Sequence, residues 1–98
     1  MDWNNKEKSR LIQAILALET ANEARRFLRD LMTKREIEDF AKRFEAAELL
    51  SQKVPYSEIE KKTGFSSTTV ARVSKWLNGD EGGYRAIISK LHHHAIPL

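Results

Sequence analysis

The sequence contains no cysteine, only two prolines and four glycines, and no long run of apolar residues. Without cysteine, neither disulfides nor thiolate metal sites can form. No segment has the pattern of a secretory hydrophobic region or a membrane span, so we expect a cytoplasmic protein with no membrane partner. Because no segment alternates apolar and polar residues as a strand does, the sequence predicts an all-α fold.

The length of 98 residues suits a single domain, 1–98. A chain this short with long apolar-faced helices is one whose core a partner could complete. The net charge of +3 is unevenly distributed: residues 1–52 contain 10 Lys and Arg against 10 Asp and Glu, whereas residues 53–98 contain 7 against 4. The positive excess therefore lies in the second half, with the sign required for an electrostatic footprint on phosphates.

Apolar periodicity predicts three helices in the first half of the chain. The first runs to about residue 18 and the second from about 21 to 32, after a capping box in which Thr20 and Glu23 satisfy each other's backbone donors. Thr33 and Glu36 repeat this device before the longest helix, which ends at about residue 52. The expected apolar positions are Leu11, Ile12, Ile15, Leu16 and Leu18, then Ala24, Phe27, Leu28 and Leu31, then Ile37, Phe40, Ala41, Phe44, Ala47 and Leu50.

Residues 55–77 read as two short helices joined by a sharp turn. Pro55 is compatible with the first turn of a fourth helix, and Ser57 with Glu60 is an alternative cap inside it, so the start stays open by a residue or two. Gly64 can take the left-handed conformation that ends a helix, and Phe65 supplies an apolar plug. Ser66 is a strong N-cap candidate for the next helix, which begins at about residue 67.

The helix after Ser66 has two distinct faces. The Ser66 hydroxyl is expected to accept a hydrogen bond from the backbone N–H of Thr68 or Thr69. Apolar residues at helical spacing define an inner face, and polar residues at i, i+4 and i+7 define an outward one that suits the major groove of DNA. The inner face comprises Val70, Val73 and Leu77, and the outward face comprises Thr68, Arg72 and Lys75. A solvated face on an ordinary helical hairpin is the alternative.

Residues 78–83 form a loop by composition, and Tyr84, Ile87, Ile88 and Leu91 predict a short sixth helix. His92–His94 follow it as a solvated tail. Consecutive histidines do not share one helix face, and no cysteine or acidic cluster accompanies them, so we expect no metal site.

The sequence offers no catalytic constellation. Glu36, Glu38 and Asp39 alternate with Arg35, Lys42 and Arg43 at the i,i+3 and i,i+4 spacings of an exposed helix face. No nucleophile with a base and no phosphate-binding loop is found. We therefore expect neither an enzyme nor a cofactor.

With these features in place, the chain resembles the tryptophan-repressor family, more particularly its Trp-repressor-like (YerC/YecD) branch. LMTKREIEDFAKRFEAAELL is similar to the central helix of the family, and IEKKTGFSSTTVARVSKWL is similar to its DNA-reading unit. The resemblance implies a six-helix, all-α homodimer in which the N-terminal helices of two chains interlace and two helix-turn-helix heads project from a shared core.

The resemblance also implies a ligand pocket at Arg43, Arg72 and Trp76, because two arginines sandwich the tryptophan corepressor in the family. Here Val73 and Trp76 add bulk where tryptophan-binding members have glycine and serine. Free tryptophan is therefore not expected as the effector, and the sequence identifies no other. Trp76 either packs against the sixth helix near Tyr84 or stacks near Arg72 or Arg43 as a tethered stand-in for the ligand.

These observations predict a sequence-specific transcriptional regulator, most simply a repressor, that binds double-stranded DNA as a homodimer. Ser66 and Ser67 would hold phosphate, and Thr68, Thr69 and Arg72 would read base edges. Lys61, Lys62 and Lys75 would add positive charge near the DNA backbone. A helical protein-interaction or oligomerisation module is the alternative from another class, and a tryptophan-responsive repressor is the alternative within this one.

Overall fold

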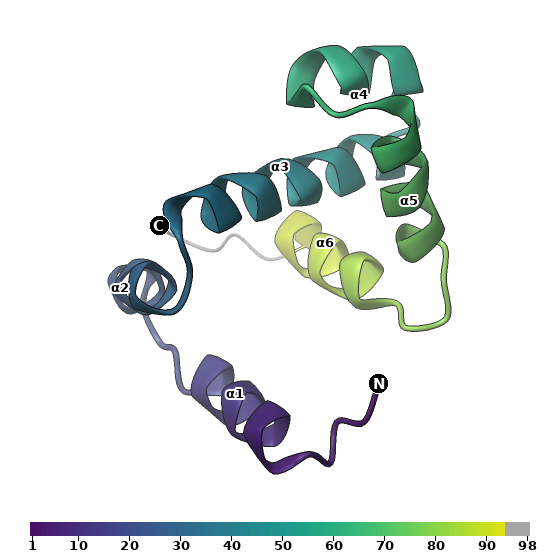
Figure 1. Ribbon diagram of the computed structural model, residues 1–98. Helices are drawn as coiled ribbons and strands as arrows, with labels where there is room; N and C mark the ends of the chain where they lie inside the picture. The colour runs from purple at the N-terminus through teal and green to yellow at the C-terminus, as the bar shows by residue number, and fades with distance from the viewer. Residues whose placement is uncertain (94–98) are drawn as a thin grey trace. The chain divides into compact units, whose positions relative to one another are not determined.

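The computed structural model describes residues 1–93, and all the regular secondary structure within that range is helical (Figure 1). The prediction of an all-α chain with six helices is confirmed. Their bounds are α1 Lys6–Leu16, α2 Ala21–Leu31, α3 Lys34–Ser51, α4 Tyr56–Thr63, α5 Ser67–Leu77 and α6 Gly83–His93.

The described residues fall into two compact units, residues 1–33 and residues 34–93. The first unit contains α1 and α2, and the second contains the other four helices.

In the first unit, α1 begins at a cap that the sequence did not reveal. The Asn5 side chain accepts hydrogen bonds from the backbone N–H groups of Glu7 and Lys8, at 3.0 and 3.1 Å. The helix ends at Leu16, two residues before the predicted end. Ala17 and Leu18 donate to carbonyls three residues back, which tightens the last turn and stops the α-helical ladder.

The capping box before α2 is half confirmed. Thr20 is the N-cap residue, and its hydroxyl accepts from the Glu23 N–H at 3.1 Å. The reciprocal bond, from the Thr20 N–H to the Glu23 carboxylate, was predicted wrongly. The carboxylate instead accepts a hydrogen bond from the N–H of Glu19 at 2.9 Å. Glu19 precedes the N-cap residue Thr20, so this bond holds the segment that leads into α2.

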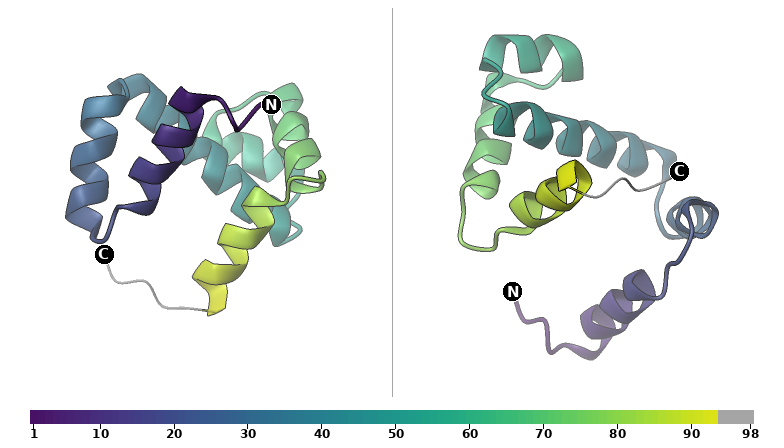
Figure 2. Two further views of the ribbon diagram at one scale, coloured as in Figure 1. Left: turned by 90° about the horizontal axis from the view of Figure 1, so that it is seen from below. Right: turned by 180° about the vertical axis from the view of Figure 1, so that it is seen from behind.

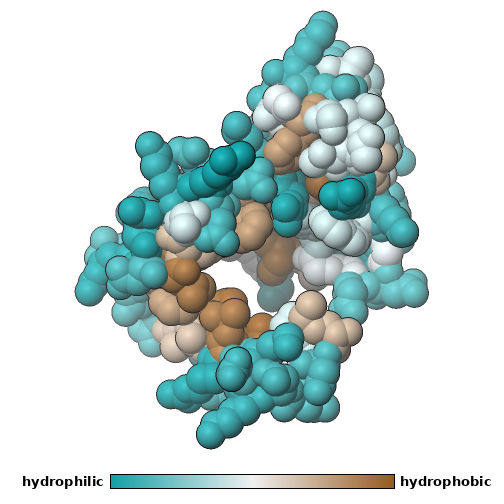
Figure 3. All heavy atoms as spheres, in the orientation of Figure 1, coloured by the Kyte–Doolittle hydropathy of each residue, from teal (hydrophilic) through white to brown (hydrophobic). Residues whose placement is uncertain are grey.

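Neither α1 nor α2 has a buried residue. Their apolar stripes remain accessible, and Leu16 is 78% exposed and Leu31 51%. Brown, hydrophobic side chains gather along these two helices in Figure 3. The apolar residues on α1 and α2 that are classed as exposed are Leu11, Ile12, Ile15, Leu16, Leu28 and Leu31.

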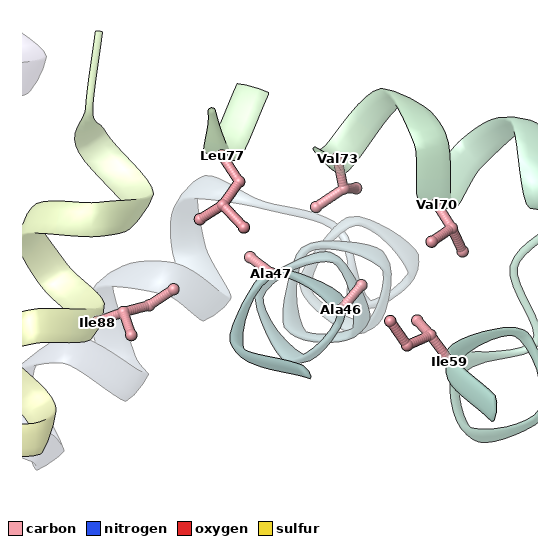
Figure 4. Packing of buried hydrophobic residues seen from close by; sticks show 7 residues of the cluster. All are labelled: Ala46, Ala47, Ile59, Val70, Val73, Leu77 and Ile88. Atoms are coloured by element: carbon pink, nitrogen blue, oxygen red, sulfur yellow. The ribbon is translucent and has the colours of Figure 1, made fainter. Parts of the chain in front are cut away.

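In the second unit, α4, α5 and α6 all pack against α3, and α5 also contacts α4 and α6 (Figure 2). The core of this unit is small, and α3 contributes only methyl groups to its fully buried part. Figure 4 shows Ala46 on the side of Ile59 and Val70, and Ala47 on the side of Leu77. The buried hydrophobic residues are Ala46, Ala47, Ile59, Val70, Val73, Leu77 and Ile88.

Two residues of the predicted apolar stripe of α3 are not buried. Phe40 is 41% exposed, and Ala41 is exposed as well. Ala46, which the 3.6-residue pattern did not select, is fully buried beside Ala47. The buried face therefore turns toward the C-terminal half of α3, where α4 and α5 pack.

Two predictions, for the start of α4 and for the residues after Leu91, are corrected by the structure. Pro55 is the N-cap of α4, so the alternative cap at Ser57 is wrong because the helix already begins at Tyr56. Helix α6 begins at Gly83 and extends to His93. His92 and His93 are thus exposed helical residues and do not form a tail, whereas His94 lies outside the described residues.

Candidate nucleic-acid interface

The turn between α4 and α5 depends on the backbone of Gly64. This residue has φ +78°, in the left-handed region, and its N–H donates to the Glu60 carbonyl at 2.8 Å, as the sequence predicted for a helix-ending glycine. A Cβ built on Gly64 would meet no atom within 4 Å. The conformation, and not a lack of space, is therefore what requires glycine here.

Thr63 fastens the same turn, and sequence reasoning missed it. Its side chain is buried, and Oγ1 donates to the Ile59 carbonyl at 2.7 Å while accepting from the Phe65 N–H at 3.2 Å. One hydroxyl thereby joins the last turn of α4 to the first residue after Gly64. A threonine directly before a helix-ending glycine is a signal that could have been recognised, because threonine readily bonds to the carbonyl four residues back.

Ser66 caps α5, which confirms the prediction. Its Oγ accepts from the Thr69 N–H at 3.2 Å, and the two side-chain oxygens lie 3.1 Å apart in a second hydrogen bond. Thr69 is half-buried and Ser66 is exposed. Ser66 and Thr69 therefore act as a pair at the start of the helix, and Thr69 is less available to a ligand than Thr68.

The two faces of α5 lie as predicted. Val70, Val73 and Leu77 are buried in the core. The exposed residues on the other side include one that was not predicted, Ala71, whose small methyl group lies among the polar side chains and lets another surface approach closely. The exposed residues of α5 are Ser67, Thr68, Ala71, Arg72, Lys75 and Trp76.

Lys61 and Lys62 lie in the last turn of α4 and are exposed. Cations at this end of a helix interact favourably with its dipole, which is a structural reason for their presence. They also precede Gly64 directly, so their positive charge lies near the start of α5. Around α4 and α5 the surface in Figure 3 is mainly teal and white, that is, hydrophilic or near neutral.

The structure brings two of the three expected pocket residues together. The guanidinium carbon of Arg43 on α3 lies 5.7 Å from the centre of the Trp76 ring on α5, and 5.0 Å from that of Phe40. Arg72 lies one helical turn before Trp76 on α5 and is exposed. A ligand between Arg43 and Trp76 would have to part them.

Two ion pairs lie along the surface of α3. Lys34 and Glu38 are 3.9 Å apart, and Arg43 and Asp39 are 3.5 Å apart, both at i,i+4 spacing. Near Arg43, burial raises the pKa of the Tyr84 hydroxyl above its usual value of 10.0, and the charge of Arg43 partly opposes this rise. The Tyr84 ring lies 6.3 Å from that of Phe44.

Within residues 1–93, no group of three or more His, Cys, Asp or Glu side chains is arranged to hold a metal ion. No helix in the described part of the chain is long and apolar enough to cross a membrane.

A family model described as "Trp repressor protein" matches residues 6–92. The chain is 36% identical over 86 residues to "Uncharacterized protein YerC" of Bacillus subtilis (strain 168), an alignment that covers 88% of this chain and 83% of the relative.

Two crystal structures are similar. "A TrpR like protein from Eubacterium eligens ATCC 27750" superposes with a TM-score of 0.85 at 36% identity, covering 92% of this chain and 93% of the other. A "putative Trp repressor from Staphylococcus aureus" also has a TM-score of 0.85, at 29% identity and with coverage of 94% and 95%.

The first prediction concerns the turn. Gly64→Ala should lower the free energy of unfolding by about 1–2 kcal/mol, because an L-residue is forced into the left-handed region. Gly83→Ala is a matched control, since a Cβ there also meets no atom within 4 Å and Gly83 is the first residue of α6. Urea unfolding at equal protein concentration measures both, and equal losses in the two variants would contradict the assignment.

Proposed function

The chain belongs to the Trp repressor family, and from this premise we propose that it is a sequence-specific DNA-binding transcriptional regulator that acts as a homodimer. The family resemblance and the all-α, Trp-repressor-like fold predicted from the sequence are confirmed. DNA binding, repression and dimerisation are what the proposal adds.

One observation carries the DNA-binding proposal: α5 has its apolar face buried and presents a mainly polar face directly after a turn that hydrogen bonds hold in place. The turn is held by Thr63, Gly64 and Ser66, so the start of α5 is fixed relative to α4. A helix supported in this way can enter the major groove, where side chains of its first turns reach base edges.

The exposed residues of α5 suggest separate roles. Arg72 can donate two hydrogen bonds to a guanine, and Thr68, one turn earlier, can contact the neighbouring base. Thr69 is paired with Ser66, so its contribution to base reading would be through its methyl group. Ala71 offers a methyl group as well, which suits contact with a thymine methyl.

The remaining candidates suit the sugar-phosphate backbone. Ser66 and Ser67 lie at the positive end of the α5 dipole, where backbone N–H groups and hydroxyls favour a phosphate. Lys61 and Lys62 on α4 and Lys75 on α5 are exposed and add charge on either side of the base-reading residues.

The homodimer is supported by the apolar residues of α1 and α2. Six large apolar side chains on these two short helices are classed as exposed, with no buried residue on either helix. Burying such stripes against a second copy of the chain would remove a large apolar surface from water. We propose that the two chains interlace through these helices.

Binding to duplex DNA tests the proposed function. Wild-type affinity should fall steeply as salt is raised, because bound lysines and arginines release counterions from the phosphates. Selection of bound duplexes from a random library should yield a palindrome with two half-sites. A helical protein-interaction module would show neither result, and any catalytic turnover would place the chain in a third class.

The second prediction separates base reading from backbone contact. Arg72→Ala should reduce discrimination between the selected site and random DNA by about 1–3 kcal/mol, because a bidentate guanine contact is lost. Lys75→Ala, on the same face of α5, should weaken both duplexes about equally. Parallel titrations by fluorescence anisotropy compare the two variants, and equal losses on both duplexes for Arg72→Ala would remove it from the base-reading set.

The third prediction concerns the dimer. The thermal midpoint should rise with protein concentration, because dissociation accompanies unfolding in an obligate dimer. Leu16→Glu should dissociate the dimer, since it places a charge in the proposed interface. Gln13→Glu introduces the same charge on the polar side of α1 and serves as the control. Sedimentation equilibrium decides, and a monomeric wild type with a concentration-independent midpoint would rule the dimer out.

The fourth prediction concerns the effector. Free L-tryptophan should not act as a corepressor, because Trp76 lies against Arg43 and Val73 is buried in the core. Calorimetric titration with millimolar L-tryptophan, with and without DNA, should give no saturable heat. Saturable heat together with tighter DNA binding would instead support a tryptophan-responsive repressor.

A further inference from the structure

Arg43 lies at the centre of a small cluster that joins two helices of the second unit. Its guanidinium carbon is 5.0 Å from the Phe40 ring centre on α3 and 5.7 Å from the Trp76 ring centre on α5. An ion pair of 3.5 Å to Asp39, one turn earlier on α3, holds the guanidinium from the side. These distances are within the range of cation–π attraction.

Trp76 is a large aromatic residue on the exposed flank of α5. It is 47% exposed and lies in the last turn of α5, one residue after Lys75 and one turn after Arg72. A large aromatic side chain on the flank of a surface helix adds little to the core. Its contact with Arg43 joins this flank of α5 to α3.

The core alone constrains α5 only in part. Val70 and Val73 pack beside Ala46 and Ala47, whose methyl groups form low ridges on α3. Interdigitation of side-chain ridges and grooves fixes the orientation of two packed helices. Low ridges bring α3 and α5 close together but interlock less with the side chains of α5, so a contact on the flank of α5 can add to its orientation.

We propose that Arg43 and Trp76 form a clamp that sets the rotation of α5 on α3 and thereby orients Arg72 and Thr68 toward DNA. Both clamp residues are positioning residues: they act through α5 and need not touch the bases. The inference rests on the proposed DNA-binding function, and it adds a determinant of specificity outside the base-reading face.

A double-mutant cycle on DNA discrimination tests the clamp. Trp76→Leu and Arg43→Met should each reduce the preference for the selected duplex over random DNA about two- to fivefold, the range expected for an exposed cation–π pair. The double variant should be no worse than either single variant, because one interaction is lost in all three. Additive losses, or unchanged discrimination in both single variants, would overturn the clamp.

Conservative variants test whether the clamp needs the aromatic ring and the planar guanidinium, or only the size and charge of the two side chains. Trp76→Phe keeps an aromatic face and should retain most of the discrimination. Arg43→Lys keeps the charge but loses the planar guanidinium, so it should lose more than Trp76→Phe. Trp3→Leu is the matched control, since Trp3 is the other tryptophan, is 52% exposed and belongs to the first unit. Full discrimination with Arg43→Lys and none with Trp76→Phe would contradict the assignment.

A second measurement distinguishes failure of the clamp from failure of the proposed function. Amide hydrogen exchange along residues 70–77, without DNA, should be faster in Arg43→Met and Trp76→Leu than in wild type and Trp3→Leu. If no protein binds DNA, the proposed function fails, and unchanged exchange in both variants would then overturn the clamp independently. Wild-type binding with unchanged discrimination in the variants overturns the clamp alone.

Discussion

The close packing of α4 and α5 on the alanine pair of α3 is the constraint on which the second unit depends. Ala46 and Ala47 are completely buried, and they allow Ile59 of α4 and Val70 of α5 to come near the axis of α3. Larger residues here would push both helices outward, because protein interiors have no free volume to absorb added methylene groups. The packing of α4 and α5 on α3 therefore depends on two of the smallest side chains in the chain.

A core this small leaves much of the orientation to polar groups. The Thr63 hydroxyl joins α4 to the turn, the Ser66 hydroxyl caps the start of α5, and Gly64 supplies the left-handed backbone conformation between them. Hydrogen bonds are directional, whereas apolar contacts are not, so a few of them can define an angle that a small apolar contact would leave loose.

Local rules explain which features could be predicted from the sequence. The Gly64 cap, the Ser66 cap and the buried face of α5 all depend on residues within one or two turns, and all three predictions are confirmed. Ala46 escaped prediction because its burial depends on where α4 and α5 pack along α3. Apolar periodicity also does not predict Thr63 or Ala71. Thr63 is polar but buried, and Ala71 is apolar but exposed.

The two units of the chain differ in how their apolar side chains are covered. Residues 34–93 contain a buried apolar core, whereas α1 and α2 have no buried residue and leave Leu16 and Leu31 largely accessible. If the proposed dimer forms through α1 and α2, substitutions there act on assembly. If α5 reads DNA as proposed, substitutions in α5 act on which sequence is bound. Positions in α3 belong to neither class alone, because the same helix carries both the alanine pair under α5 and the arginine beside Trp76. If α5 reads DNA as proposed, we therefore expect substitutions in α3 to alter sequence specificity without contacting DNA, because α3 supports α5 and orients it.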